Sequence, residues 1–162
     1  MDSSVRTARR RALAAVALGG LGLLVAAAGA AAEDAAAIVT ARVAHFRDIG
    51  RAAHVVQIEV GKPSADTAAV GEAARKIEGL ASEIPSWFPA GSGPESGATT
   101  QARPQIWVDP AGFQARAAAL GAAAKALEAA AAASDQGGVK SGFMTLAQAC
   151  QGCHNAFRTA QH

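Results

Sequence analysis

The chain has 162 residues, of which 51% are hydrophobic, 17% are charged and 4% are aromatic, and its formal net charge is +2. This length suits one domain with one core, and so small a positive excess excludes the broad basic surface of a nucleic-acid-binding protein. Much of the hydrophobic content is alanine, which predicts closely approaching helices around a core with little side-chain volume.

The first 32 residues have the three-part pattern of an export signal. Four arginines between positions 6 and 11 form a basic start, Ala12–Ala28 is apolar, and Ala30–Ala32 supplies the small residues of a cleavage site. We therefore expect residues 1–32 to be a cleaved signal peptide and the protein to reach the periplasm. The alternative is a retained anchor, but the segment is short and rich in alanine for a membrane-spanning helix. Stable membrane insertion is therefore not expected.

Removal of this signal would change the charge of the protein. The remaining residues 33–162 contain 11 lysines and arginines and 12 aspartates and glutamates, a net charge of −1. The basic pI of the whole chain would then belong to the signal, and no nucleic-acid partner is expected. We assign residues 33–162 to one domain.

Two helices are predicted in the first half of this domain. Apolar residues at mostly three- and four-residue steps indicate a helix from about Asp34 to Val60. Gly61–Ser64, which includes a proline, ends it. A second helix is predicted from Ser64 or Asp66 to Glu83, before Pro85. No strand pattern is present.

A long connection and two further helices follow. Residues 86–105 are rich in Gly, Pro and Ser, and this length is unusual for a loop inside a compact bundle. Asp109 and Pro110 form an N-cap and first residue for a helix that reaches about Ala133. A turn at 134–138 precedes the last helix, predicted at Val139–Ala160. Four helices of this length indicate an all-α, antiparallel four-helix bundle.

The last predicted helix contains the only two cysteines, Cys150 and Cys153, followed directly by His154. C-x-x-C-H is the attachment motif of c-type haem, in which both thiols form thioethers and the histidine binds iron. The i, i+3 and i+4 spacing puts the three side chains on one helical face, where a flat porphyrin contacts them together. We therefore predict one covalent haem c with His154 as axial ligand.

Three other interpretations of the two cysteines were considered. A redox dithiol of the thioredoxin kind needs a βαβ context, which this chain lacks. A structural zinc site needs four ligands, and no second Cys or His pair lies nearby. A short-loop disulfide is the third, and an exported protein would form it if haem did not capture the thiols.

Several segments of the chain resemble one family. They are Arg42-x-x-x-Phe46, Ile84-Pro85-Ser86-Trp87-Phe88-Pro89-Ala90-Gly91, Arg103-Pro104-Gln105-Ile106-Trp107-x-Asp109 and Cys150-x-x-Cys153-His154-x-x-Phe157-Arg158. With them, and with the haem motif near its C-terminal end, the chain resembles class II c-type cytochromes, the cytochrome c′ group.

The resemblance implies a bundle with haem bound between the helices and His154 as proximal ligand. It also implies Arg42 near a haem propionate, Phe46 over the open face of the iron, and Arg158 beside the proximal ligand. For Trp87 two interpretations stay open, since it either packs against a haem edge or caps the core. The family commonly forms homodimers through its first two helices, and we expect the same here.

The sixth iron ligand separates the possible functions. Low-spin members of the family use a methionine where this chain has Phe46, which cannot bind iron. Met144 lies on the same helix as His154, about 15 Å away along the axis, so we expect it in the core. His45 and His54 point about 100° and 80° away from Phe46 and remain the alternative ligands. We predict five-coordinate iron.

Electron transfer in the periplasm, with redox proteins as partners, is the function that the sequence favours. The alternative is a protein that binds NO or CO to sequester or sense it, which five-coordinate iron permits. A haem enzyme such as a peroxidase needs a distal acid–base pair, and Phe46 at the distal position argues against it. We therefore expect no enzymatic activity.

Overall fold

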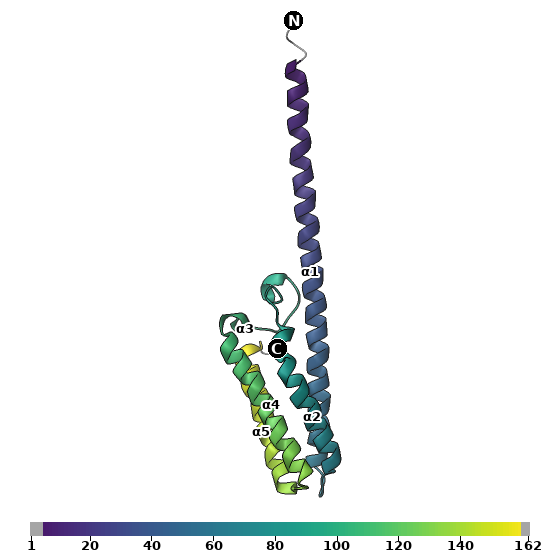
Figure 1. The fold of residues 1–162 in the computed structure, drawn as a ribbon, viewed down its shortest axis with the longest axis vertical. Coiled ribbons are helices and arrows are strands. Elements are labelled where there is room, and N and C mark those ends of the chain that lie inside the picture. The colour runs from purple at the N-terminus through teal and green to yellow at the C-terminus, as the bar shows by residue number, and fades with distance from the viewer. Residues whose placement is uncertain (1–4, 160–162) are drawn as a thin grey trace.

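The computed structural model describes the backbone of residues 5–159 and the side chains of residues 33–159. Four long helices form an antiparallel bundle (Figure 1). They are α1 (Val5–Val60), α2 (Thr67–Glu83), α4 (Pro110–Ala132) and α5 (Gln136–Phe157). This confirms the predicted all-α bundle. The predicted signal falls on residues whose side chains lie outside the described part, so it stays a prediction.

Helix α1 begins well before Asp34, where its start was predicted. That prediction took the start of the helix from the expected cleavage site and not from a residue that caps or breaks a helix. No proline precedes Pro63, and the upstream segment is rich in alanine and leucine, so nothing in the uncleaved chain ends the helix. In the part of the chain that the structure describes, no helix is long and apolar enough to cross a membrane.

Asp109 begins α4 as predicted. Its Oδ1 accepts a hydrogen bond of 2.9 Å from the N–H of Gly112, and Pro110 occupies the first helical position. Asp66 caps α2 in the same way, with bonds from the N–H groups of Ala68 and Ala69. These caps fix where the two helices start, because each satisfies backbone donors that have no partner within the helix.

Helix α5 is shifted from its predicted range, Val139–Ala160. It begins earlier because Asp135 caps it, accepting a bond of 2.9 Å from the N–H of Gly138. It ends at Phe157 because Arg158 adopts an extended backbone, with φ −122° and ψ 139°, and pairs with Ala102 in an isolated β-bridge. A contact with the long connection therefore ends the helix that carries the haem motif.

The helices pack in the sequence α1 on α2, α2 on α4 and α4 on α5. Ile77, Leu127 and Leu146 are among the fully buried side chains at their centre. A Cβ on Gly142 of α5 would lie 3.0 Å from Cδ1 of Leu127, which shows how closely α4 and α5 approach. Helices α1 and α5 have much less direct contact than these neighbouring pairs.

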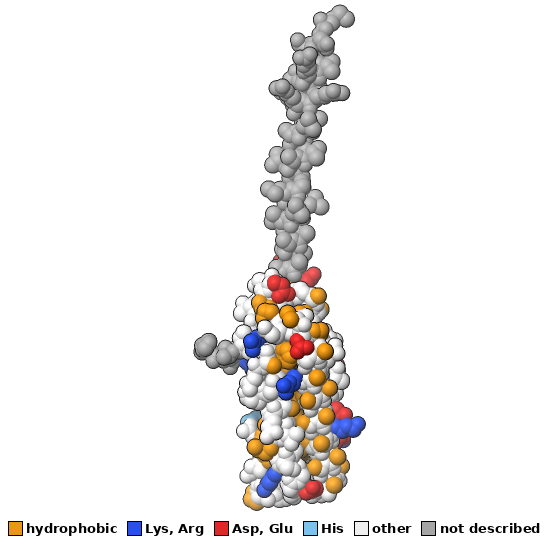
Figure 2. All heavy atoms as spheres, turned by 90° about the vertical axis from the view of Figure 1, so that its left-hand side faces the viewer, with side chains coloured by type: hydrophobic (Ala, Val, Ile, Leu, Met, Phe, Trp, Pro, Cys, Tyr) orange, Lys and Arg blue, Asp and Glu red, His pale blue; other side chains and the backbone are white. Residues whose placement is uncertain are grey.

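Figure 2 shows the molecule from the α4 and α5 side, where apolar side chains stand in columns among scattered charges. On α4 these are mostly exposed alanines, which recur at helical spacing. They include Ala111, Ala115, Ala118, Ala122, Ala126 and Ala129. Small side chains explain how a chain that is half hydrophobic has few large apolar groups on the surface of this helix.

The long connection contains three short helical turns. They are η1 (Ile84–Trp87), η2 (Pro94–Ser96) and α3 (Gln105–Val108). The indole N–H of Trp107 donates to the carbonyls of Phe88 and Pro89, at 3.2 and 3.1 Å, and so holds the two ends of the connection together. The connection is therefore built against the end of the bundle that carries the haem motif (Figure 1).

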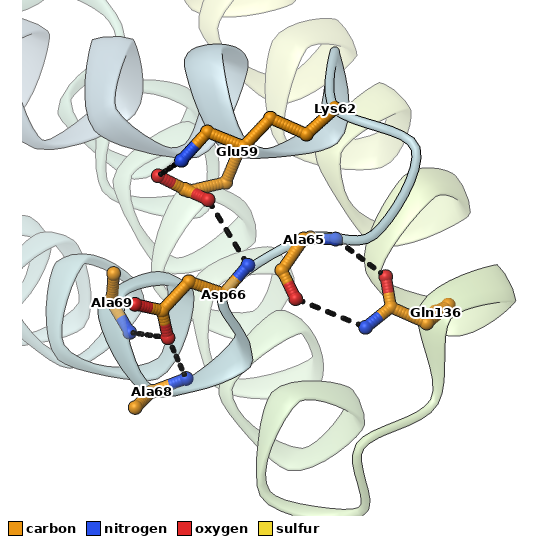
Figure 3. A network of polar contacts seen from close by, with 7 residues as sticks. All are labelled: Glu59, Lys62, Ala65, Asp66, Ala68, Ala69 and Gln136. Atoms are coloured by element: carbon orange, nitrogen blue, oxygen red, sulfur yellow. Dashed lines mark hydrogen bonds and ion pairs between the residues drawn. The ribbon is translucent and has the colours of Figure 1, made fainter.

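The opposite end of the bundle is closed by a polar network (Figure 3). Glu59 lies 2.6 Å from Lys62 Nζ and accepts a bond of 3.0 Å from the N–H of Asp66. The side-chain amide of Gln136 both accepts from the N–H of Ala65, at 2.9 Å, and donates to its carbonyl, at 3.1 Å. The turn between α1 and α2 is thereby joined to the start of α5.

Candidate haem site

Cys150, Cys153 and His154 lie on the last two turns of α5. Both cysteine side chains are partly buried against the hydrophobic core, whereas His154 is exposed. Burial raises the pKa of both thiols, and the neighbouring Arg116 guanidinium partly opposes this at Cys153. The environment therefore favours uncharged sulfur, which is also the state of a thioether.

The imidazole of His154 is favoured in its neutral form. Although much of the His154 side chain is exposed, partial loss of hydration around the ring and then the positive charge of Arg158 lower the pKa of His154. Neutral imidazole is the form that binds metals through a ring nitrogen. The donor set of two thiols and one neutral imidazole on one helix thus fits haem c.

The structure gives no support to the other interpretations of the two cysteines. Cys150 and Cys153 are not joined in a disulfide. Among the side chains of residues 33–159, no group of three or more His, Cys, Asp or Glu is placed to hold a metal ion. The described backbone contains no strand beside these cysteines other than the single bridge at Ala102, so the βαβ context of a redox dithiol is absent there.

Phe46 of α1 belongs to a series of aromatic rings that crosses the bundle. It lies edge-on to Trp87, with ring centroids 5.3 Å apart, and 6.2 Å from Phe88. Phe88 contacts Phe113 at 4.9 Å, and Phe113 contacts Phe157 at 5.2 Å. Rings in T-shaped contact thus run from Phe46 on α1 to Phe157, which lies three residues after His154 on α5.

Trp87 packs against His45 of α1 as well as against Phe46. Trp87 is 8% exposed and stacks on His45, with centroids 4.7 Å apart and an interplanar angle of 21°. His54 is exposed, and its Nδ1 lies 3.4 Å from Oε1 of Gln57. Trp87 therefore packs in the core beside Phe46, and its contact with a haem edge stays a prediction.

Arg42 is a buried cation, only 3% exposed. It donates to Ser92 Oγ at 3.1 Å and to Thr100 Oγ1 at 2.6 Å, and its guanidinium lies 4.6 Å from the ring centre of Phe88. Burial lowers the pKa of Arg42, and the more distant Glu95 carboxylate partly opposes this shift. The two hydrogen-bonding partners carry no charge, so the site suits an additional anionic group such as a haem propionate.

Arg158 and Met144 complete the predicted set. Arg158 Nε donates to Gln101 Oε1 at 2.8 Å, and its backbone N–H donates to the carbonyl of His154 at 3.0 Å. Met144 is 59% exposed, so its predicted core position is wrong. The inward stripe of α5 instead uses Leu146 and Phe157, and Met144 points away from it.

Sequence reasoning missed Arg116 and the hydroxyl partners of Arg42. A Cβ on Gly152, between the two cysteines, would lie 3.1 Å from Nη1 of Arg116, so this α4 side chain covers the haem motif. Ser92 and Thr100 lie in a segment without periodicity, 50 and 58 residues from Arg42. The sequence signal at Ser92 was only the Gly-, Pro- and Ser-rich composition of the connection, and no signal pointed to Thr100.

The fold and the haem motif define a c-type haem protein built on a four-helix bundle. The family model described as Cytochrome C' matches residues 37–158. The chain belongs to the cytochrome c′ family. A cytochrome c′ of Rubrivivax gelatinosus is 38% identical over 68 residues, which are 42% of this chain and 53% of that protein. This match spans only about half the length of that relative.

Solved structures agree with this family. The crystal structure of cytochrome c′ from Rubrivivax gelatinosus matches with a TM-score of 0.68 and 28% identity, over 77% of this chain and 97% of that chain. A mutant of cytochrome c prime from Alcaligenes xylosoxidans, solved as its nitric oxide complex, matches with a TM-score of 0.61 and 27% identity, over 80% of this chain and 97% of that chain.

Proposed function

We propose that the exported chain is a periplasmic mono-haem cytochrome that transfers single electrons. In this proposal Cys150 and Cys153 hold haem c, and His154 is the only protein ligand of the iron. One observation carries the proposal. Helices α1 and α5, which have little direct contact with each other, bear Phe46 and the haem motif, and aromatic rings connect them.

The bound haem would supply one-electron exchange and one open coordination position. The side chains of the protein would orient the haem and shield it from water. Arg42 would pair with a propionate and so fix the rotation of the macrocycle about its attachment. Phe46 and the rings beside it would exclude water from the distal side. Electron exchange with a partner protein needs no acid–base group, and Phe46 offers none.

A second function, binding of NO or CO, is favoured by the same apolar distal side. A phenyl ring offers no hydrogen-bond donor to a bound dioxygen, whereas small neutral gases do not depend on one. The nitric oxide complex of the related Alcaligenes xylosoxidans mutant supports this candidate. Electron transfer and gas binding are compatible in one protein, since electron exchange needs no open coordination position and gas binding uses one.

Export and dimerisation belong to the same proposal. Cleavage after residue 32 would leave a chain that begins at Glu33.

Dimerisation through α1 and α2 is supported by exposed apolar side chains on α1. They are Val43, Val55 and Ile58, which are 40%, 40% and 50% exposed. Single side chains of this kind are common on surfaces, but three on one helix suit a helix–helix interface.

Mass spectrometry and optical spectra of the exported protein test the haem and its ligands. We expect the mass of residues 33–162 plus one haem, and high-spin ferric and ferrous spectra. The bare polypeptide mass, in cells that mature cytochromes c, would refute the haem. A sharp low-spin α-band would instead refute five-coordination and point to His45 or His54 as sixth ligand.

Substitution of Phe46 by alanine tests the distal side. We expect Phe46→Ala to speed binding of NO and CO to the ferrous protein by about tenfold, equivalent to a barrier lower by about 1.4 kcal/mol. Stopped-flow mixing measures this rate, and Arg47→Ala, an exposed change on the same helix, is the matched control. Equal rates in both variants would show that Phe46 does not cover the iron.

A further inference from the structure

Residues 100–103, which we name the strap, pair with the chain just after the haem motif. The N–H of Arg103 donates to the carbonyl of Phe157 at 3.0 Å, and the N–H of Thr159 donates to the carbonyl of Gln101 at 2.9 Å. Ala102 and Arg158 form the antiparallel bridge between these bonds. The strap therefore holds the residues at which α5 ends.

Side chains strengthen this pairing on both of its edges. Arg103 Nη1 donates to the carbonyl of Asn155 at 3.2 Å, and Arg158 Nε donates to Gln101 Oε1 at 2.8 Å. The N–H of Arg158 also donates to the carbonyl of His154. A displacement of the strap would thus act on the helical turn that contains the proximal ligand.

The other side of the strap is tied to α1 through one hydroxyl group. Thr100 Oγ1 accepts a bond of 2.6 Å from Arg42 Nη2 and another of 3.1 Å from the N–H of Ala102. Arg42 lies four residues before Phe46, on the same face of α1. Because the guanidinium is buried and also bonded to Ser92, it has little freedom to move independently of its helix.

We propose that the strap couples the position of Phe46 to the orientation of His154, with Thr100 as the positioning residue. This inference rests on the proposed gas-binding function, because Phe46, if it covers the distal side, has to move when a gas reaches the iron. Direct contact between α1 and α5 is slight. Besides the aromatic rings that run from Phe46 to Phe157, a second connection passes movement of α1 to the end of α5. It consists of the bonds Arg42–Thr100 and Thr100–Ala102 and the pairing of Ala102 with Arg158.

Three variants distinguish the effect of the Thr100 hydroxyl group from the effect of the side-chain shape. Thr100→Val removes the acceptor and keeps the branched shape, whereas Thr100→Ser keeps the hydroxyl. Thr99→Val is the matched control, because Thr99 is the exposed neighbour and no hydrogen bond of its side chain is present in the described structure. All three are made in the full haem-loaded protein.

Two measurements report the two ends of the coupling. Hydrogen exchange gives the opening of the Ala102, Arg103 and Thr159 amides, and the resonance Raman band of the iron–histidine bond in the ferrous protein gives the orientation of His154. In Thr100→Val we expect exchange to be faster by about tenfold and the iron–histidine band to shift or broaden. Thr100→Ser and Thr99→Val should match the unsubstituted protein in both.

Two results would overturn the inference. One is a Thr100→Val protein that matches Thr99→Val in both measurements. The other is faster exchange with an unchanged iron–histidine band, which would make the strap a structural support only. If Thr100→Val does not fold, Gln101→Ala, which removes one bond between the strap and Arg158, is read by the same two criteria. A low-spin spectrum of the unsubstituted protein would instead refute the proposed five-coordinate iron. In that case the hydrogen-exchange measurement alone would decide whether the Thr100 hydroxyl holds the strap.

Discussion

The two ends of the bundle each bury one charged side chain, but the groups that contact the two charges differ. Glu59, at the end farther from the haem motif, is 7% exposed and is neutralised by Lys62 and by a backbone N–H group. Arg42, at the haem end, is 3% exposed and is bonded only to hydroxyl groups and an aromatic ring. Glu59 has an opposite charge in direct contact, whereas the Glu95 carboxylate acts on Arg42 only from a distance.

On this difference we base the assignment of a structural role to Glu59 and the proposal that Arg42 pairs with a ligand. Burial of an ion is costly unless an opposite charge or several hydrogen bonds compensate it. The Glu59 network is complete within the protein, and it joins three helices (Figure 3). The direct partners of Arg42 are neutral hydroxyl groups, and a haem propionate is the charged partner that we propose for it.

The largest expected effect comes from removal of the Arg42 charge. In the haem-loaded protein, Arg42→Met should lower the free energy of unfolding by about 3–5 kcal/mol, because it leaves a buried propionate without its partner. Urea unfolding followed by circular dichroism measures this loss. Arg47→Met, an exposed change on the same helix, is the control, and equal losses in the two variants would contradict the assignment of Arg42 to a propionate.

A smaller effect is expected at the opposite end. Gln136→Ala removes two hydrogen bonds to the backbone of Ala65, so the free energy of unfolding should fall by about 1–3 kcal/mol. The haem spectrum should stay unchanged, because this end is separate from the haem motif. Gln148→Ala, an exposed site on the same helix, is the control. A changed spectrum would show that the two ends are not independent.

The smallest effect, and the only one that depends on pH, concerns Glu59. Bonds from Lys62 and then from the N–H of Asp66 lower the pKa of Glu59 from its ordinary value of 4.5. A lowered carboxyl pKa stabilises the folded state above that ordinary value, and this contribution is lost as the pH falls through the lowered one. Because Lys62 is half exposed, solvent screens the ion pair and keeps the effect modest.

Glu59→Gln tests this dependence directly. The variant should be less stable than the unsubstituted protein at pH 7, and the difference should disappear in acid, below the folded pKa of Glu59. Thermal unfolding at a series of pH values measures it. A difference that stays constant from pH 7 into acid would show that the shape of the amide, and not the lost charge, causes the destabilisation.

The sequence by itself determined the four helices, the cap at Asp109 and the haem motif on one face of the last helix. Helical periodicity, capping and i, i+3, i+4 spacing are local properties, so neighbours in the sequence are sufficient to predict them. Two local predictions were wrong, the core position of Met144 and the end of α5. Both depend on how α5 packs against the rest of the chain, which neighbours in the sequence do not determine.

Only the tertiary structure decided what surrounds the site. The hydroxyl groups on Arg42, the cover of Gly152 by Arg116 and the pairing of the strap with the end of α5 all join segments that are tens of residues apart. The connection between α2 and α4 has no repeating pattern, so its path follows from the helices against which it packs. Which side chains meet there is therefore a property of the folded chain and not of any local stretch of sequence.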